Sequence, residues 1–185
     1  MGLRRGFKAE ANRISARVRE KLSLAANDPI KPAAICRLFD IDLIELSKLP
    51  VDAREFLQVD RSSFSAVTIP CAHRRAIVHN DAHHPFRQNS NICHELAHCF
   101  LGHEFAPPLT DQGERTRDSA QEEEAHFLGG VLLLPDEAAK LIALRGLKNK
   151  ACDMFGVSDD MLKYRLRVSG ALAIAGRLAA KRAIR

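Results

Sequence analysis

The sequence predicts an α+β protein with a helical N-terminus, a small and mostly antiparallel sheet, then a helix that carries an HExxH motif and further helices. Three observations support this class. Apolar residues recur every three to four positions near the N-terminus, two strand-like runs flank a turn in the middle, and helical periodicity resumes from the motif onward. The 185 residues are enough for one domain with a sizeable core, and they contain no internal repeat.

The N-terminal part is predicted to hold two helices and two short strands. Helix-forming residues with periodic apolar positions predict a helix over 7–26, which Asn-Asp-Pro at 27–29 ends. Pro32 suits the first turn of a second helix that reaches Phe39. Short apolar runs at 41–46 and 55–59, on either side of a proline break, are interpreted as strands.

The middle of the chain is predicted to form a β-hairpin followed by the motif helix. The runs 64–69 and 75–79 are rich in β-forming residues, and a proline lies in the turn between them. The motif helix is expected to begin at Arg87 or Asn89 and to end near Gly102, because glycine commonly terminates a helix.

The C-terminal half is predicted to be a long polar loop followed by helices. Two prolines and many polar residues indicate a loop over 103–118. Helices are then expected from Ser119 to the residue before Pro135, over 136–144 and over 159–167, with a last Ala-rich helix after Gly170.

Composition and charge limit the partners and the location. No stretch approaches the roughly 20 apolar residues of a membrane span. The first ten residues lack the apolar core of a signal peptide, and the five cysteines contain no CxxC pair, so we expect reduced thiols in the cytoplasm. The net charge of +5 is concentrated at the two ends, but no nucleic-acid-binding motif accompanies it. We therefore expect a solvated basic surface, no direct nucleic-acid binding and no membrane association.

The motif HELAH provides three residues that can act on one metal ion. His94 and His98 are four residues apart, so on a helix their imidazoles share one face and can bind one tetrahedral Zn²⁺. Glu95 projects beside them, near enough to hold a water molecule. Cys93 and Cys99 point about 100° away around the helix and are interpreted as core residues. A polar helix can contain this motif by chance, so a third ligand is needed to decide whether the motif belongs to a metal site.

A catalytic zinc ion usually has three protein ligands. His103 follows the second motif histidine by five residues, whereas the HExxHxxGxxH arrangement needs six with glycine at the bend, so that arrangement fails. The next predicted helix contains EEEAH, in which Glu122, Glu123, Glu124 and His126 stay open as the third ligand. Glu122 has a structural alternative, since Ser119-x-x-Glu122 matches a capping box.

Two adjacent glycines, Gly129 and Gly130, lie inside this second helix. Each glycine destabilises a helix by about 1 kcal/mol relative to alanine. Tight packing against the motif helix would explain why both are kept. The sequence therefore predicts that the two helices approach each other closely.

Short segments on both sides of the motif carry a family resemblance. They are Ile77-Val78-His79-Asn80, Arg87-Gln88, Glu122-x-x-Ala125, Leu132-Leu133-Leu134-Pro135, Val157-Ser158 and Arg165-Leu166. HExxH occurs in unrelated peptidases, whereas its combination with E-x-x-A and LLxP is more specific. With these segments the sequence resembles the ImmA/IrrE-type zinc metallopeptidases over about residues 30–168.

The resemblance implies a division of the chain into three parts. An N-terminal helix at 1–29 would precede a compact, zincin-like metallopeptidase domain at 30–168, and a basic C-terminal helix or tail would fill 169–185.

The resemblance also implies a set of site residues. Glu122 would complete the zinc site with His94 and His98. Where the family usually has Asn or Asp, this chain has His126, one helical turn beyond Glu122. His126, together with Glu124 and Tyr164, is a candidate for orienting a ligand or stabilising the transition state.

The function implied is a zinc-dependent endopeptidase, in which Glu95 takes a proton from water and delivers it to the leaving amine. Family members commonly cut helix-turn-helix repressors in transcription regulation and stress responses, so a separate repressor or antitoxin-like protein is the expected substrate. The hairpin at 64–79 offers an edge strand for an extended peptide. The alternative is a non-catalytic, metal-stabilised regulatory protein that binds such a partner without cutting it.

Overall fold

The α+β class is confirmed. The computed structural model describes residues 2–71, 74–103 and 118–183. No helix in these ranges is long and apolar enough to cross a membrane. In chain order, the described elements are α1 (Phe7–Lys21), α2 (Pro32–Leu38), β1 (Ile41–Glu45), η1 (Leu46–Lys48), η2 (Glu55–Val59), β2 (Ala66–Cys71), β3 (Arg74–His79), α3 (Pro85–Leu101), α4 (Ser119–Leu133), α5 (Asp136–Arg145), α6 (Lys148–Phe155), α7 (Asp159–Val168) and α8 (Ala171–Ala183).

The sheet is small and mixed, with the strand order β1-β3-β2. β2 and β3 form the predicted antiparallel hairpin, in which Thr68 lies opposite Ile77. β1 runs parallel to β3, with Leu43 opposite Ile77. After β1 the chain passes through η1 and η2 and forms β2 at the far edge of the sheet. It then turns back as β3 between the other two strands, which gives β3 the same direction as β1. The expected antiparallel pairing therefore holds for the hairpin alone.

The strand predicted at Glu55–Val59 is wrong, because this segment forms the π-helical turn η2. Its backbone bonds are local: the amide of Leu57 donates to the carbonyl of Ala53 at 3.0 Å. The ring of Phe56 lies 5.8 Å from that of Phe64 and anchors the turn beside the sheet. A run of five residues with mixed apolar spacing fits a strand or a turn equally well.

The predicted helices are found with small shifts at their ends, and one helix was missed. α1 stops at Lys21 instead of residue 26, because Ser23 adopts a left-handed conformation with φ of 56°. The unpredicted helix is α6, whose eight residues are too few to show a clear period. The last helix begins directly after Gly170, as predicted.

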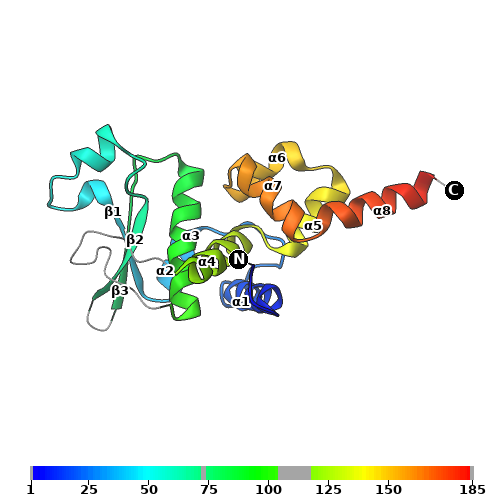
Figure 1. The fold of residues 1–185 in the computed structure, drawn as a ribbon, viewed down its shortest axis with the longest axis horizontal. Helices are drawn as coiled ribbons and strands as arrows, with labels where there is room; N and C mark the ends of the chain where they lie inside the picture. Colours follow the sequence, from blue (N-terminus) through cyan, green and yellow to red (C-terminus); the bar gives the residue numbers. More distant parts are fainter. Residues whose placement is uncertain (1, 72–73, 104–117, 184–185) are drawn as a thin grey trace.

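The motif helix occupies the middle of the molecule. Figure 1 shows the sheet at one end, α3 standing beside it, α4 and α1 next, and α5 to α7 at the other end, from which α8 projects. α3 packs on β2 and β3 with one side and makes its most extensive contact with α4. The two helices that carry the candidate site residues are therefore direct neighbours.

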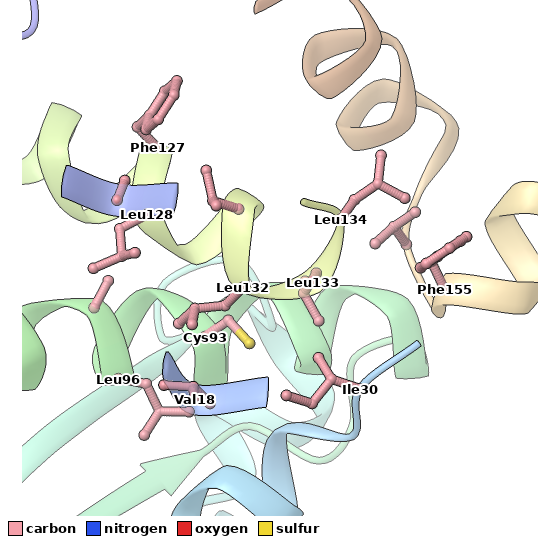
Figure 2. Close-up of a cluster of buried hydrophobic side chains, with 14 of the residues drawn as sticks. Val18, Ile30, Cys93, Leu96, Phe127, Leu128, Leu132, Leu133, Leu134 and Phe155 are labelled. Carbon is pink, nitrogen blue, oxygen red and sulfur yellow. The ribbon is translucent and has the colours of Figure 1, made fainter. Parts of the chain in front are cut away.

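One continuous core joins these layers. Figure 2 shows that α1, α3, α4 and the segment before α2 contribute side chains to the same cluster. α4 is buried around nearly its whole circumference in its second half, which fixes its position more firmly than a surface helix. The labelled members of the cluster are Val18, Ile30, Cys93, Leu96, Phe127, Leu128, Leu132, Leu133, Leu134 and Phe155.

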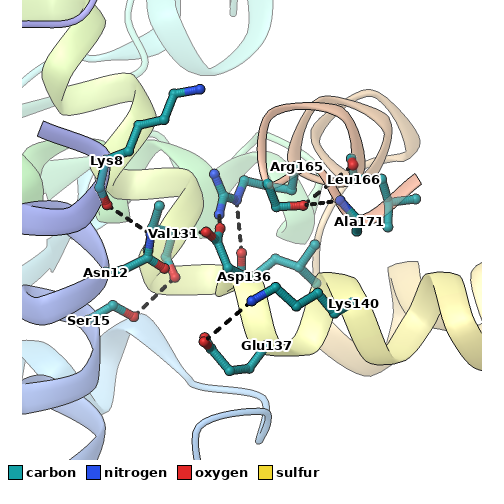
Figure 3. A network of polar contacts seen from close by, with 12 residues as sticks. Lys8, Asn12, Ser15, Val131, Asp136, Glu137, Lys140, Arg165, Leu166 and Ala171 are labelled. Atoms are coloured by element: carbon teal, nitrogen blue, oxygen red, sulfur yellow. Dashed lines mark hydrogen bonds and ion pairs between the residues drawn. The ribbon is translucent and has the colours of Figure 1, made fainter. Parts of the chain in front are cut away.

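Two buried arginines satisfy backbone carbonyls at the C-terminal end of α4, where a helix lacks its own donors. Arg19 of α1 donates to the carbonyl of Leu132 at 2.8 Å. Arg165 of α7 donates from Nε to the carbonyl of Leu134 at 2.9 Å and from Nη2 to Asp136 Oδ1 at 2.6 Å (Figure 3). Each arginine is at most 1% exposed, so burial lowers its pKa, to about 10 for Arg19. The end of α4 is thus tied to α1, α5 and α7.

Candidate metal centre

The motif helix is capped at both ends. At its start, the Nδ1 atom of His84 accepts a hydrogen bond from the amide of Phe86 at 3.2 Å, and Pro85 occupies the first turn. At its end, Gly102 takes the left-handed conformation, with φ of 65°. The helix therefore begins slightly earlier than Arg87 and stops where predicted. Cys93 and Cys99 are buried free thiols, which confirms their core position.

The two motif histidines point their Nε2 atoms at one another, 3.0 Å apart. Glu122 reaches the same point from α4, with one carboxylate oxygen 3.2 Å from His94 Nε2 and the other 3.8 Å from His98 Nε2. Three ligands of a tetrahedral Zn²⁺ ion lie about 3.3 Å from one another for bonds near 2.0 Å. The donor set and its spacing therefore fit a His₂Glu metal site, and among the described residues this is the group able to hold a metal ion.

Glu122 does not serve as the capping-box residue considered for it. The N-cap of α4 is Asp118, whose side chain accepts from the amide of Ala120 at 2.9 Å. Ser119 is instead the first residue of the helix. Glu122 is therefore the fourth residue of the helix and not the third, which is the capping-box position, and its carboxylate faces the two histidines.

Glu124 and His126 lie at other positions around α4 than Glu122. Glu124 pairs with Arg4 at 2.7 Å, on the side of α4 toward the N-terminal segment. The exposed His126 lies with its ring 5.0 Å from that of Tyr164. Although part of the ring reaches solvent, partial burial lowers the pKa of His126, and nearby His94 lowers it further. The structure thus places His126 beside the metal group and Glu124 behind it.

Glu95 is held by the sheet. Its Oε2 accepts a hydrogen bond of 2.7 Å from Thr68 Oγ1 on β2. Burial raises the pKa of the Glu95 carboxyl, while the Thr68 hydrogen bond and the nearby His94 partly oppose that rise. Sequence reasoning missed Thr68, because its role depends on how β2 packs on α3 and no local pattern announces it.

A pocket of about 180 Å³ opens next to His94. It lies between the motif helix, α4 and α7, and its walls combine small, apolar and neutral polar groups. Such a pocket beside a metal group can receive a side chain of a bound molecule. Its lining residues are Ser90, Asn91, His94, His126, Gly129, Gly130 and Met161.

The predicted close approach of the two helices is confirmed at Gly129. A Cβ atom placed there would lie 3.1 Å from the carbonyl carbon and oxygen of Cys93 and from the amide nitrogen of His94. Gly130 instead faces α7, where a Cβ would meet Arg165 Cδ at 3.0 Å and Met161 Sδ at 3.2 Å. Gly129 therefore sets how close Glu122 comes to the motif histidines.

Replacing Gly129 by alanine is expected to destabilise the protein by about 1–3 kcal/mol, as in other overpacked cores. The contacted atoms are backbone and cannot rotate away, so α4 must shift from α3 and carry Glu122 with it. Chemical denaturation and zinc titration would measure both effects. Gly176→Ala is the matched control: a Cβ there meets nothing within 4 Å, so the better helix propensity should leave stability equal or slightly higher. Unchanged stability and zinc affinity in Gly129→Ala would contradict this account.

The chain also matches a model of a known protein family. The family model described as IrrE N-terminal-like domain, Peptidase_M78, matches residues 36–167, which include every candidate site residue on α3, α4 and α7. The comparison with curated proteins finds no match.

Proposed function

We propose that the chain, which belongs to the IrrE N-terminal-like domain family of peptidases, is a zinc-dependent endopeptidase that cuts a separate regulatory protein. Family membership gives a metallopeptidase-like domain. The observation that carries the finer proposal is the convergence of His94, His98 and Glu122 within 4.8 Å, with Glu95 beside them. Two imidazoles and one carboxylate form a ligand set that catalytic zinc sites use, and they leave a coordination position open.

The ion would be held by His94, His98 and Glu122. When bound, zinc supplies a Lewis acid for the peptide carbonyl and lowers the pKa of water at its open position toward about 7. Proton transfer and binding of the peptide are carried out by residues of the chain.

Glu95 is the proposed general base. Its carboxylate accepts a proton from the attacking water and returns it to the leaving amide nitrogen. The hydrogen bond from the Thr68 hydroxyl to Oε2 fixes the Glu95 side chain for this proton transfer. Burial of the carboxyl raises its pKa, which strengthens it as a base.

Two further surfaces fit an extended peptide. In the described part of the chain β2 pairs only with β3, so its other edge can take an added strand close to Thr68 and Glu95. The pocket beside His94 would receive a substrate side chain, and His126 on its wall would donate a hydrogen bond to the carbonyl oxygen. Tyr164 would support this by packing against the His126 ring.

The substrate that we propose is a helix-turn-helix repressor or an antitoxin-like regulator in the cytoplasm. The choice of substrate rests on the resemblance to the ImmA/IrrE-type family, whose members commonly act on such proteins in transcription regulation and stress responses. The test is to incubate zinc-loaded protein with candidate repressors and to search for new peptide termini by mass spectrometry. Termini that accumulate with time, and vanish with a chelator, are expected. A stable complex in which no termini appear would overturn the proposal in favour of a regulator that binds without cutting.

A further inference from the structure

A line of polar side chains lies behind His98, on the side away from Glu122. The Nε2 atom of His98 faces the metal group, and its other ring nitrogen, Nδ1, lies 2.9 Å from Nδ1 of His103. The left-handed turn at Gly102 folds the chain back, so that the amide of His103 donates to the carbonyl of His98 at 3.1 Å. The turn at the end of the motif helix thus brings the imidazole ring of His103 into contact with that of His98.

The line continues to the N-terminal segment. His103 Nε2 lies 3.6 Å from Glu124 Oε2, a distance for electrostatic attraction and not for a direct hydrogen bond. Glu124 Oε1 lies 2.7 Å from Arg4 Nε, and the other guanidinium nitrogens of Arg4 bind Glu10 at 2.7 and 3.0 Å. The Arg4 guanidinium also lies 4.9 Å from the centre of the Phe7 ring. Arg4, in the segment before α1, therefore holds Glu124 in place and is itself fixed by Glu10 in the first turn of α1.

The three inner members of this line are shielded from water. The exposed fractions are 14% for the side chain of His98, 9% for His103 and 13% for Glu124. Hydrogen bonds and charges act more strongly in such surroundings than at an exposed surface.

We propose that His103 is a positioning residue for the metal site, which fixes the ring of His98, and that Glu124 and Arg4 fix His103 in turn. This inference rests on the metal site of the proposed function. A histidine that binds a metal through Nε2 carries its proton on Nδ1. The Nδ1–H of His98 then donates to Nδ1 of His103, which must accept and therefore carries its own proton on Nε2, toward Glu124. Partners of this kind set the tautomer and orientation of a ligand histidine.

The geometry separates this role from that of a ligand. The His103 nitrogen nearest to His98 contacts Nδ1, whereas the metal group gathers at Nε2, on the other side of the imidazole. His103 therefore supports the site from behind, which agrees with the failure of its spacing for the HExxHxxGxxH arrangement.

The test is zinc affinity, measured by competition with a chelating dye. His103→Leu removes the acceptor and keeps an apolar side chain of moderate size, and we expect a 10–100-fold weaker affinity, the usual effect of losing such a partner. His103→Asn restores an acceptor near the Nδ1 position and should recover most of the affinity. His84→Leu is the control, because it removes a histidine hydrogen bond at the opposite end of the same helix and should leave zinc affinity unchanged.

A second readout is independent of affinity. In zinc-loaded protein, nitrogen-15 spectra should show a hydrogen-bonded Nδ1 proton on His98, which His103→Leu loses and His103→Asn retains. Glu124→Gln keeps the shape of the side chain and should weaken zinc binding less than His103→Leu does. Zinc affinity equal to wild type in folded His103→Leu, or an Asn variant as weak as the Leu variant, would overturn the positioning role alone. Failure of the wild type to bind zinc would overturn this role together with the proposed function.

Discussion

Glu95→Gln is expected to lower the rate of peptide cleavage by about 10²–10⁴-fold, the contribution of a positioned general base. Glutamine keeps the shape of the side chain and can still accept the Thr68 hydrogen bond, but it cannot take a proton from water. Zinc content should stay at the wild-type value, since the candidate ligands are His94, His98 and Glu122. The rate of appearance of new termini and the zinc content per chain measure the two effects.

Glu137→Gln is the control for the loss of a carboxylate. Glu137 lies on the surface of α5, where its partner Lys140 is 3.9 Å away, and it has no part in the site. The Glu137→Gln variant should cleave the substrate at the wild-type rate. Cleavage by Glu95→Gln at the rate of Glu137→Gln would rule out Glu95 as the base.

The second large effect is on stability. Arg165→Met is expected to destabilise the protein by about 3–5 kcal/mol, because it removes the donor to the buried carbonyl of Leu134 and to the Oδ1 atom of Asp136. For a chain of this length that corresponds to a fall of roughly 6–20 °C in Tm. Asp136 also accepts from Asn12 at 3.1 Å, so the contact among α1, α5 and α7 should loosen together. Thermal and chemical unfolding followed by circular dichroism measure the change.

Lys163→Met is the matched control on the same helix. Lys163 pairs with Asp159 at the surface, where both side chains are more than half exposed. Exposed pairs contribute little to stability, so this variant should unfold close to wild type. If Arg165→Met were as stable as Lys163→Met, the buried network would not be what holds the end of α4.

Much of the candidate site was predictable, because its signals are local. Four-residue spacing places His94 and His98 on one face of any helix, and α3 is a helix. Gly129 was informative because a helix keeps such a residue at a cost, and the structure shows the backbone that it touches. The roles of these residues toward a metal ion stay predictions until zinc is measured.

The remainder depends on distances between segments far apart in the chain. Thr68 reaches Glu95 only through the packing of β2 on α3. Arg4 and Glu124 meet because α1 lies beside α4, although 120 residues separate them. No periodicity in the sequence encodes such contacts. The hydrophobic pattern likewise does not determine the direction of β1, and it does not distinguish the π-helical turn at Glu55–Val59 from a strand.

The central claim is tested most directly by elemental analysis of zinc per chain in wild type, His94→Ala and Glu122→Ala. The geometry predicts one zinc ion in the wild type and a loss or strong weakening in both variants, because each removes one of three converging ligands. Circular dichroism of the variants would show that they still fold. A wild type that takes up no metal after reconstitution with zinc, or a Glu122→Ala variant that keeps its zinc, would contradict the account.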